Sequence, residues 1–206
     1  MKIALMGPPA CGKGTQARRL REKYGLPHIS SGDILRDEVA RGTDFGIQVK
    51  QYMDRGEIGP ATLITEMVLA HLHSHCPGGF ILDGFPRTVF QAWELMKEHD
   101  LDAVYLVDVS EDEVLRRITG RRTCQGCGNI YSIHRDAPAS GLCASCGGKL
   151  VQRDDDNEET ARNRLAVYTR ETAPVAGFYR DRGLLKSIPG ARSPEEIFAD
   201  ITAQLG

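Results

Sequence analysis

The chain has 206 residues, of which 41% are hydrophobic and 26% charged, and its formal net charge is −2. This length fits one sizeable domain with a small insertion, and the near-neutral charge gives no indication of nucleic acid or membrane partners. The apolar run from Ile3 to Met6 is shorter than a signal-peptide core, and no stretch approaches the roughly 20 apolar residues of a membrane span. We therefore expect a cytoplasmic protein.

Short apolar runs separated by helical stretches predict an α/β fold, with a parallel sheet covered by helices on both faces. The expected strands are 3–6, 80–82, 103–107 and 184–188, and the expected helices include 13–24, 111–119, 157–179 and 194–204. Capping boxes are predicted where a serine precedes a glutamate by three residues, at Ser110 with Glu113 and at Ser193 with Glu196. We expect a bend of the long helix at Pro174.

Two segments interrupt the alternation of strands and helices. Residues 30–59 are predicted to be helical and to form a small lobe of their own. Residues 121–156 hold four cysteines and too few large apolar side chains for a core, which predicts an inserted lobe. The core is then left with residues 1–29, 60–120 and 157–206.

The run from Gly7 to Thr15, GPPACGKGT, follows a predicted strand and opens a predicted helix. In that setting a glycine-rich loop turns its backbone amides toward a phosphate, and Lys13 adds a positive charge. Gly14 stands where such loops usually carry the hydroxyl that binds Mg²⁺, so we expect the metal to be held through water by an acid elsewhere. Asp83, at the end of a predicted strand, is the first candidate and Asp33 the second.

The four cysteines form two CxxC pairs, Cys124 with Cys127 and Cys143 with Cys146. This spacing predicts a tetrahedral thiolate site for a structural Zn²⁺, although iron or cobalt would suit the same ligands. Two disulfides and a nucleic-acid-binding ribbon are the alternatives. We expect the two remaining cysteines, Cys11 and Cys76, to be reduced.

His71, His73 and His75 with Cys76 suggest a second metal site at first sight. Alternate residues of a helix point in different directions, however. We assign this group to a solvated helix end and give it no chemistry.

Several stretches in order along the chain resemble the adenylate kinases. They are GPPACGKGTQ at 7–16, ISSGDILR at 29–36, LDGFPR at 82–87, GRR at 120–122 and RDDDNEET at 153–160, followed by Arg162 and Arg164. The resemblance implies a P-loop three-layer fold with a central parallel sheet. It also implies that 30–59 is a helical AMP-binding lobe and that 121–156 is a small, zinc-ribbon-like, metal-binding lid over the core.

The resemblance further implies a reversible, Mg²⁺-dependent ATP:AMP phosphotransferase that maintains the adenine nucleotide balance, with ATP, AMP and ADP as its partners. Catalytic roles fall on Lys13, Asp83, Arg87, Arg121, Arg153 and Arg164. The ATP contacts would be Ala10, Cys11, Gly12, Lys13, Gly14, Thr15, Arg117, Arg121, Ile130, Tyr131 and Arg192. The AMP contacts would be Ser31, Arg36, Glu57, Ile58, Gly59, Gly84, Phe85, Pro86, Arg87, Gln91, Arg153 and Arg164.

Arginine suits this chemistry because its planar fork grips two phosphate oxygens and stays charged. The family pattern makes Asp155 and Asp156 hinge residues or residues that orient arginines. Rival hypotheses are a P-loop kinase for another acceptor, such as a different nucleoside monophosphate, and a nucleotide switch or zinc-ribbon binding module. We expect a monomer.

Overall fold

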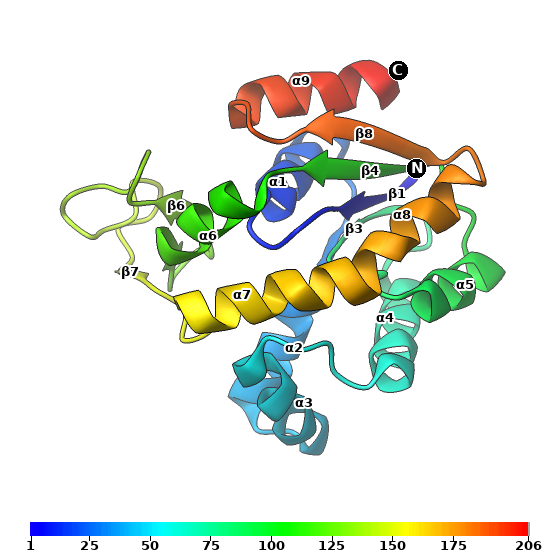
Figure 1. Ribbon diagram of the computed structural model, residues 1–206, viewed down its shortest axis with the longest axis horizontal. Coiled ribbons are helices and arrows are strands. Elements are labelled where there is room, and N and C mark those ends of the chain that lie inside the picture. Colours follow the sequence, from blue (N-terminus) through cyan, green and yellow to red (C-terminus); the bar gives the residue numbers. More distant parts are fainter. Residues whose placement is uncertain (206) are drawn as a thin grey trace.

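The computed structural model describes residues 1–205 and contains two β-sheets, with helices packed around the larger one (Figure 1). Within these residues the larger sheet has the strand order β2-β3-β1-β4-β8, and every neighbouring pair is parallel. Its strands are β1 (Lys2–Met6), β2 (His28–Ser30), β3 (Phe80–Asp83), β4 (Ala103–Asp108) and β8 (Leu185–Pro189). The predicted α/β fold with a central parallel sheet is confirmed.

Helices cover both faces of this sheet, which completes the predicted three layers. The side chains of β1 show why, because they alternate between two apolar clusters. Ile3 and Leu5 pack with α1 and α9, whereas Ala4 and Met6 pack with α4, α5 and α8. These helices are α1 (Lys13–Tyr24), α9 (Pro194–Leu205), α4 (Ala61–His75), α5 (Val89–Glu98) and α8 (Ala173–Arg180).

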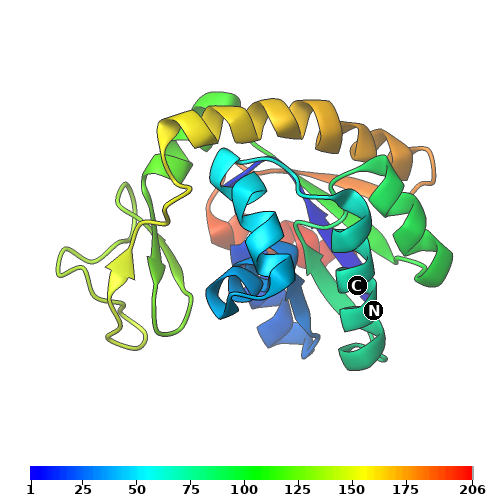
Figure 2. The same cartoon turned by 90° about the horizontal axis from the view of Figure 1, so that it is seen from below.

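The predicted long helix is interrupted before its proline. It consists of α7 (Glu158–Val167), a π-helical turn named η1 (Tyr168–Thr172), and α8, which follow one another along one edge of the molecule (Figure 2). Pro174 lies in the first turn of α8. Since proline has no amide hydrogen to donate to the preceding turn, the helix widens there and then resumes.

Two smaller parts stand out from the sheet and its covering helices. Helices α2 (Ser31–Arg41) and α3 (Asp44–Arg55) pack on each other and protrude at the bottom of Figure 1. After α6 (Glu111–Thr119), the second sheet projects to the left in both views. It is antiparallel, in the order β6-β5-β7, with β5 (Arg121–Cys124), β6 (Ile130–Ser132) and β7 (Leu150–Val151). Residues 121–156 are called the four-cysteine segment below.

The two predicted capping boxes lie at the starts of α6 and α9, and only one of them forms. At α9 the box forms, because the amide of Ser193 donates to Glu196 Oε2 at 2.9 Å and the amide of Glu196 donates back to Ser193 Oγ at 3.3 Å. At α6 the prediction is wrong, since the Ser110 side chain makes no capping hydrogen bond to any described residue. The Glu113 carboxylate is engaged instead by Arg116 and Arg117.

None of the helices formed by residues 1–205 is both long and apolar enough to cross a lipid bilayer.

Candidate active site and metal centre

The phosphate loop connects β1 to α1 at the carboxyl edge of the parallel sheet. Gly7 has a positive φ of 141°, and a Cβ at this position would lie 2.3 Å from the carbonyl oxygen of Val107, so only glycine fits. Gly12 caps α1 with φ 110°, and the first turn of that helix carries no acidic residue. The loop therefore presents free amides and the positive end of a helix dipole, which together bind anions.

Lys13 lies over its own loop. Its Nζ donates to the carbonyl oxygens of Gly7 at 2.9 Å and Pro8 at 2.8 Å, and lies 3.3 Å from Sγ of Cys11. The ammonium group is thus held at the mouth of the amide cradle. A phosphate entering the cradle meets both the amides and this charge.

The loop forms one wall of a cleft of about 950 Å³, which is the size of a small-molecule site. The cleft gathers residues from the core, from α2 and from the four-cysteine segment. Every predicted ATP contact lines it: Ala10, Cys11, Gly12, Lys13, Gly14, Thr15, Arg117, Arg121, Ile130, Tyr131 and Arg192. Arg36, Asp83, Arg87, Arg153 and Arg164 line it as well.

A second, smaller cavity of about 50 Å³ shares walls with the cleft, since Arg36, Arg87 and Arg164 line both. Most predicted AMP contacts surround it, namely Ser31, Arg36, Glu57, Ile58, Gly59, Gly84, Arg87, Gln91 and Arg164. Pro86 and Arg153 line the large cleft instead. The structure places Phe85 in the hydrophobic core, with 1% of its surface exposed, and it lines neither cavity.

Carboxylates and carbonyls hold the cleft arginines in place. Arg121 grips Asp156 with two donors, one of them at 2.7 Å, and Arg164 pairs with Asp155. Arg87 Nε donates to the carbonyl oxygen of Gly84 at 2.7 Å. Arg164 Nη1 also lies 3.7 Å from Oδ1 of Asp156. Since Asp156 is fully buried, losing Arg121 and Arg164 as partners would leave an unpaired buried charge. Asp155 and Asp156 therefore orient arginines, as the family pattern implies.

The arginines of the cleft also repel one another. Burial, with Arg164 next in importance, lowers the pKa of Arg87 to about 10, and burial with Arg36 lowers the pKa of Arg153 to about 10. Both groups stay charged at neutral pH, because these values lie well above it. A bound phosphate would neutralise this local excess of positive charge, so the site is electrostatically prepared for an anion.

Asp83, the last residue of β3, faces the phosphate loop. A Cβ on Gly14 would lie 3.2 Å from Asp83 Oδ2, so the glycine that departs from the usual loop pattern lets this carboxylate approach closely. Nε2 of His28 lies 3.4 Å from the same oxygen. The position suits a carboxylate that orients the waters of Mg²⁺ bound to phosphates. Asp33 pairs with Arg36, and although burial raises its pKa, that arginine outweighs the effect and lowers it.

Arg117 is held by Glu113, the carboxylate whose spacing from Ser110 also fits a helix cap. Glu113 accepts from Arg117 Nε at 2.7 Å, while the two terminal nitrogens donate to the carbonyl oxygens of Cys11, at 3.2 Å, and Gly190, at 3.0 Å. Hydrogen bonds from Arg116 and Arg117 outweigh burial and lower the pKa of Glu113 to about 2. The spacing of three and four residues to two arginines was the available signal.

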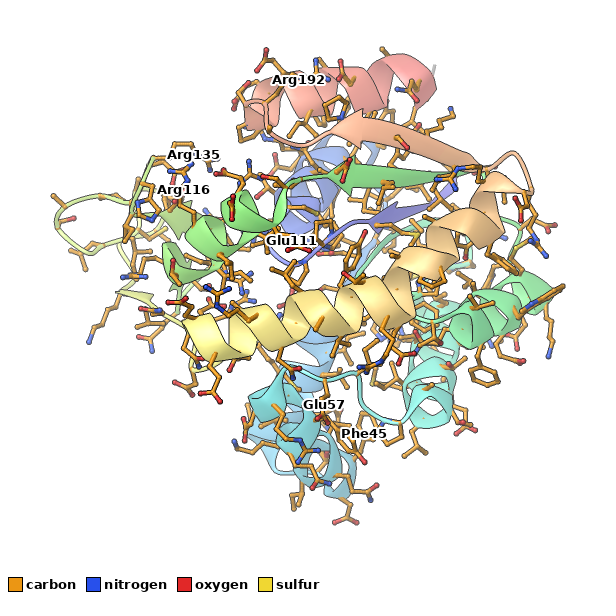
Figure 3. All side chains as sticks on the ribbon, viewed as in Figure 1. Phe45, Glu57, Glu111, Arg116, Arg135 and Arg192 are labelled. Carbon is orange, nitrogen blue, oxygen red and sulfur yellow. The ribbon has the colours of Figure 1, made fainter. Side chains whose placement is uncertain are left out.

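Arg192, a predicted ATP contact, and Glu57, a predicted AMP contact, lie on different parts of the molecule. Figure 3 places Arg192 at the start of α9 and Glu57 beside α3, with α7 between them in that view. The Arg192 side chain pairs with Asp200 of α9, and Glu57 pairs with Arg55. Arg192 lines the large cleft and Glu57 the smaller cavity, so these predicted ATP and AMP contacts belong to different parts of the joined cavities.

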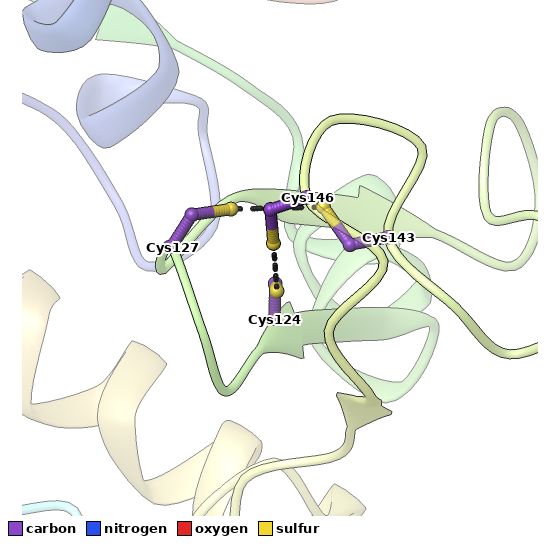
Figure 4. A group of neighbouring side chains, drawn as sticks. All are labelled: Cys124, Cys127, Cys143 and Cys146. Carbon is purple, nitrogen blue, oxygen red and sulfur yellow. Dashed lines mark hydrogen bonds between the residues drawn. The ribbon is translucent and has the colours of Figure 1, made fainter.

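The four predicted metal ligands come together within the four-cysteine segment (Figure 4). All four sulfur atoms lie within 4.8 Å of one another, with Cys124 to Cys146 at 3.4 Å and Cys127 to Cys143 at 3.6 Å. A tetrahedral ion with Zn–S bonds of about 2.3 Å needs sulfurs about 3.8 Å apart. A disulfide needs about 2.05 Å, and all six cysteines are free. The residues fit a metal and not the disulfide alternative.

Neighbouring groups support two of these sulfurs, those of Cys143 and Cys124, as thiolates. The hydroxyl of Tyr131 lies 3.2 Å from Sγ of Cys143, and this hydrogen bond is the main reason that the pKa of Cys143 falls to about 6. The amide of Gly126 donates to Sγ of Cys124 at 3.3 Å. A Cβ on Gly148 would lie 2.9 Å from that sulfur, so the loop leaves room only for the cluster.

Fold and site together define a phosphate-loop nucleotide-binding α/β protein with an inserted metal-binding segment. A model of the adenylate kinase family matches residues 5–184 of the chain. Adenylate kinases of Thermodesulfovibrio yellowstonii and Archaeoglobus fulgidus are 48% and 47% identical to it, each covering 100% of this chain and 99% and 98% of the relative. An adenylate kinase from a Geobacillus species is 46% identical, over 100% of this chain and 99% of the relative. The chain belongs to the adenylate kinase family, and it is a phosphotransferase that acts between ATP and AMP.

Proposed function

We propose that the cleft transfers the γ-phosphoryl group of ATP to AMP through the residues that line it. The observation that carries this proposal is the convergence of the phosphate loop and six arginines on one cleft. Lys13 and the loop amides hold the ATP phosphates, with Arg117 and Arg121 beside them. Arg36 and Arg87 hold the AMP phosphate, and Arg153 and Arg164 bridge the two.

In this reaction an oxygen of the AMP phosphate bonds to the γ-phosphorus while the bond from that phosphorus to the β,γ-bridging oxygen breaks. Two ADP molecules result, and no proton has to be removed because the acceptor phosphate is already anionic at neutral pH. The migrating group is loosely bonded at the transition state, so the arginines contribute by spreading its charge and keeping donor and acceptor in line. Mg²⁺, its waters oriented by Asp83, would neutralise charge on the donor phosphates.

The smaller cavity is proposed to hold the AMP base. Oε1 of Gln91 accepts the amide of Arg87 at 2.8 Å, whereas its buried Nε2 has no partner among residues 1–205. A buried donor left free is costly, and a ring nitrogen of a purine could accept from it. Ser31 Oγ donates to the carbonyl oxygen of Gly84 at 2.7 Å and so helps to close this wall.

Three parts of the chain are proposed to move relative to one another. Residues 1–29, 60–120 and 157–206 form the core, 30–59 the AMP-binding lobe and 121–156 the lid. Water is a rival acceptor, so closure of both lobes over two bound nucleotides would exclude it before transfer. In support, Arg36 comes from one lobe, Arg153 from the lid and Lys13 from the core, yet one cleft holds all three.

The lid metal is proposed to be Zn²⁺ with a structural role, since four sulfur ligands leave no position for water. Iron or cobalt would suit the same tetrahedron, and elemental analysis of the purified protein distinguishes them. Four thiols arranged for a metal fit a reducing compartment, so we propose a cytoplasmic protein. We also propose that it acts as a monomer without nucleic acid, because one chain supplies every residue of the proposed site.

The decisive experiment mixes the purified protein with ADP and Mg²⁺ and no other nucleotide. The proposal requires ATP and AMP to appear in equal amounts. A kinase for another monophosphate would give no ATP from ADP alone but would phosphorylate CMP, UMP or GMP in the presence of ATP. A nucleotide switch would release inorganic phosphate slowly without an acceptor. Either of these two results contradicts the proposal.

A further inference from the structure

A second group of metal-type ligands lies at the ends of α4 and α5, outside the cleft and the four-cysteine cluster. His73 comes from the last turn of α4, Glu98 is the last residue of α5, and His99 caps α5. One ligand atom from each lies within 4.8 Å of the other two, and His73 Nε2 is 2.8 Å from Glu98 Oε2. We propose that these three residues bind a divalent transition-metal ion such as Zn²⁺.

The ligand types and their spacing suit such an ion. Two imidazoles and one carboxylate are a common set for Zn²⁺, with bonds of about 2.0–2.2 Å, and water completes the shell. His73 and Glu98 are 57% and 40% exposed, so both side chains can turn to admit an ion between them. The sequence did not indicate this site. His71, His73 and His75 point in different directions on α4, and the partners of His73 lie at the end of α5.

His99 supplies an independent indication. Its Nε2 is buried and has no hydrogen-bond partner among the described residues, and buried polar atoms are rarely left in that state. The His99 ring packs edge-on against the Phe80 ring, with 5.3 Å between the ring centroids, and its centroid lies 5.4 Å from that of the His73 ring.

The backbone also favours a cation at this position. Both helices end here, since the amides of Cys76 and His99 make the last helical bonds of α4 and α5, each at 2.9 Å. The carboxyl ends of helices carry partial negative charge. Together with the Glu98 carboxylate, two such ends offset the charge of Lys2, which pairs in the sheet with Phe80, the residue that His99 packs against.

A metal at this site would join α4 to α5 and would not take part in phosphoryl transfer. Phe80, against which His99 packs, is the first residue of β3, whereas Asp83 at the other end of that strand lines the cleft. Binding should therefore raise the melting temperature in proportion to the logarithm of free metal above Kd. Turnover at saturating substrate should stay the same.

The test starts from protein that already carries one metal ion per chain by elemental analysis. Zn²⁺ is titrated into it by calorimetry, and thermal unfolding is followed in parallel. One further ion should bind. Because His73→Ala and Glu98→Gln each remove a direct ligand, each should weaken this binding by more than the roughly 10- to 100-fold lost with an outer-shell partner.

His71→Ala is the matched control. His71 is on the same helix, and its ring stacks on that of His75 at 4.5 Å, outside the proposed site. This variant should keep the second ion. The proposal is overturned if no second ion binds, if His73→Ala binds it unchanged, or if only His71→Ala loses it, which would assign the ion to the His71 and His75 pair.

Discussion

Arg18 of α1 donates a hydrogen bond of 2.9 Å from Nη1 to Oδ1 of Asn129 in the four-cysteine segment. Asn129 in turn donates from Nδ2 to Ser145 Oγ at 3.0 Å, and its carbonyl oxygen accepts the amide of Cys124 at 2.8 Å. A connected set of hydrogen bonds thus runs from the helix after the phosphate loop through one cysteine knuckle to the other. Asn129 also precedes Ile130 and Tyr131, which line the cleft.

This contact predicts that Arg18 and Asn129 stabilise the lid over bound ATP. Arg18→Ala and Asn129→Ala should each raise KM for ATP, and the double variant should be no worse than the poorer single one. A hydrogen bond worth about 0.5–1.5 kcal/mol corresponds to about 2- to 10-fold in KM. Arg21→Ala, on the same helix, is the control. Fully additive effects would mean that the two residues act independently.

Lys13 should contribute mainly to the transition state. Its Nζ is already held at the loop by the carbonyl oxygens of Gly7 and Pro8, so little reorganisation is needed when charge moves between the phosphates. Lys13→Met should lower kcat by about 10²–10³, as removal of one electrostatic stabiliser does elsewhere. Lys23→Met removes a charge from the same helix and should leave kcat unchanged. If Lys13→Met altered only KM, Lys13 would merely bind substrate.

Glu113 should stabilise the protein in a pH-dependent way. Its pKa is about 2 in the folded protein against 4.5 for a free glutamate, because Arg116 and Arg117 bind its ionised form. The depressed value means that the stabilisation is complete above pH 4.5 and is lost as the pH falls through about 2. Glu113→Gln should therefore lower the unfolding free energy at neutral pH, and by less at pH about 3.

Urea unfolding at both pH values measures this difference. Glu111→Gln, two residues earlier on α6, is the control because that residue is exposed. Glu113→Gln should also raise KM for ATP, since one of the three partners of Arg117 loses its charge and holds the guanidinium less firmly. A constant stability difference between wild type and Glu113→Gln at both pH values would exclude the ion pairs as its cause.

The parts of the fold that could be predicted from the sequence are those with a strong local pattern. The apolar runs of β1, β3 and β4 stand out because both of their faces are buried, and the phosphate loop carries its own glycine pattern. β2, by contrast, is the three-residue strand His28–Ser30 with one buried side chain, and it exists only because β3 pairs with it. Such a strand has no local signal.

Side-chain partners were harder to predict than the residues of the site. By spacing alone, Glu113 could cap α6 or pair with arginines. It pairs with Arg117 because hydrogen bonds to the carbonyl oxygens of Cys11 and Gly190 hold that side chain in place. The bond between Arg18 and Asn129 joins residues 111 positions apart. Such pairs depend on tertiary packing, which spacing in one sequence does not encode.

Removal of one cysteine ligand should affect stability more than catalysis. Four thiolates hold a segment that lacks an apolar core, so Cys127→Ser should lose the metal and lower the melting temperature strongly. Turnover should remain measurable at low temperature, where the lid can still close. Cys76→Ser, which removes a thiol outside the cluster, should keep the full metal content. A Cys127→Ser protein with an unchanged melting curve would contradict a structural metal.

Tyr131 should connect the metal to the nucleotide site, because its hydroxyl reaches Cys143 while its residue lines the cleft. Tyr131→Phe removes only that hydroxyl, and loss of such an outer-shell hydrogen bond should weaken metal binding by about 10- to 100-fold. Competition with a coloured chelator measures the affinity directly, without reference to turnover. Tyr168→Phe is the matched control, since Tyr168 also lines the cleft but lies outside the cysteine cluster. Equal metal affinity in wild type and Tyr131→Phe would show that the hydroxyl does not support the thiolate.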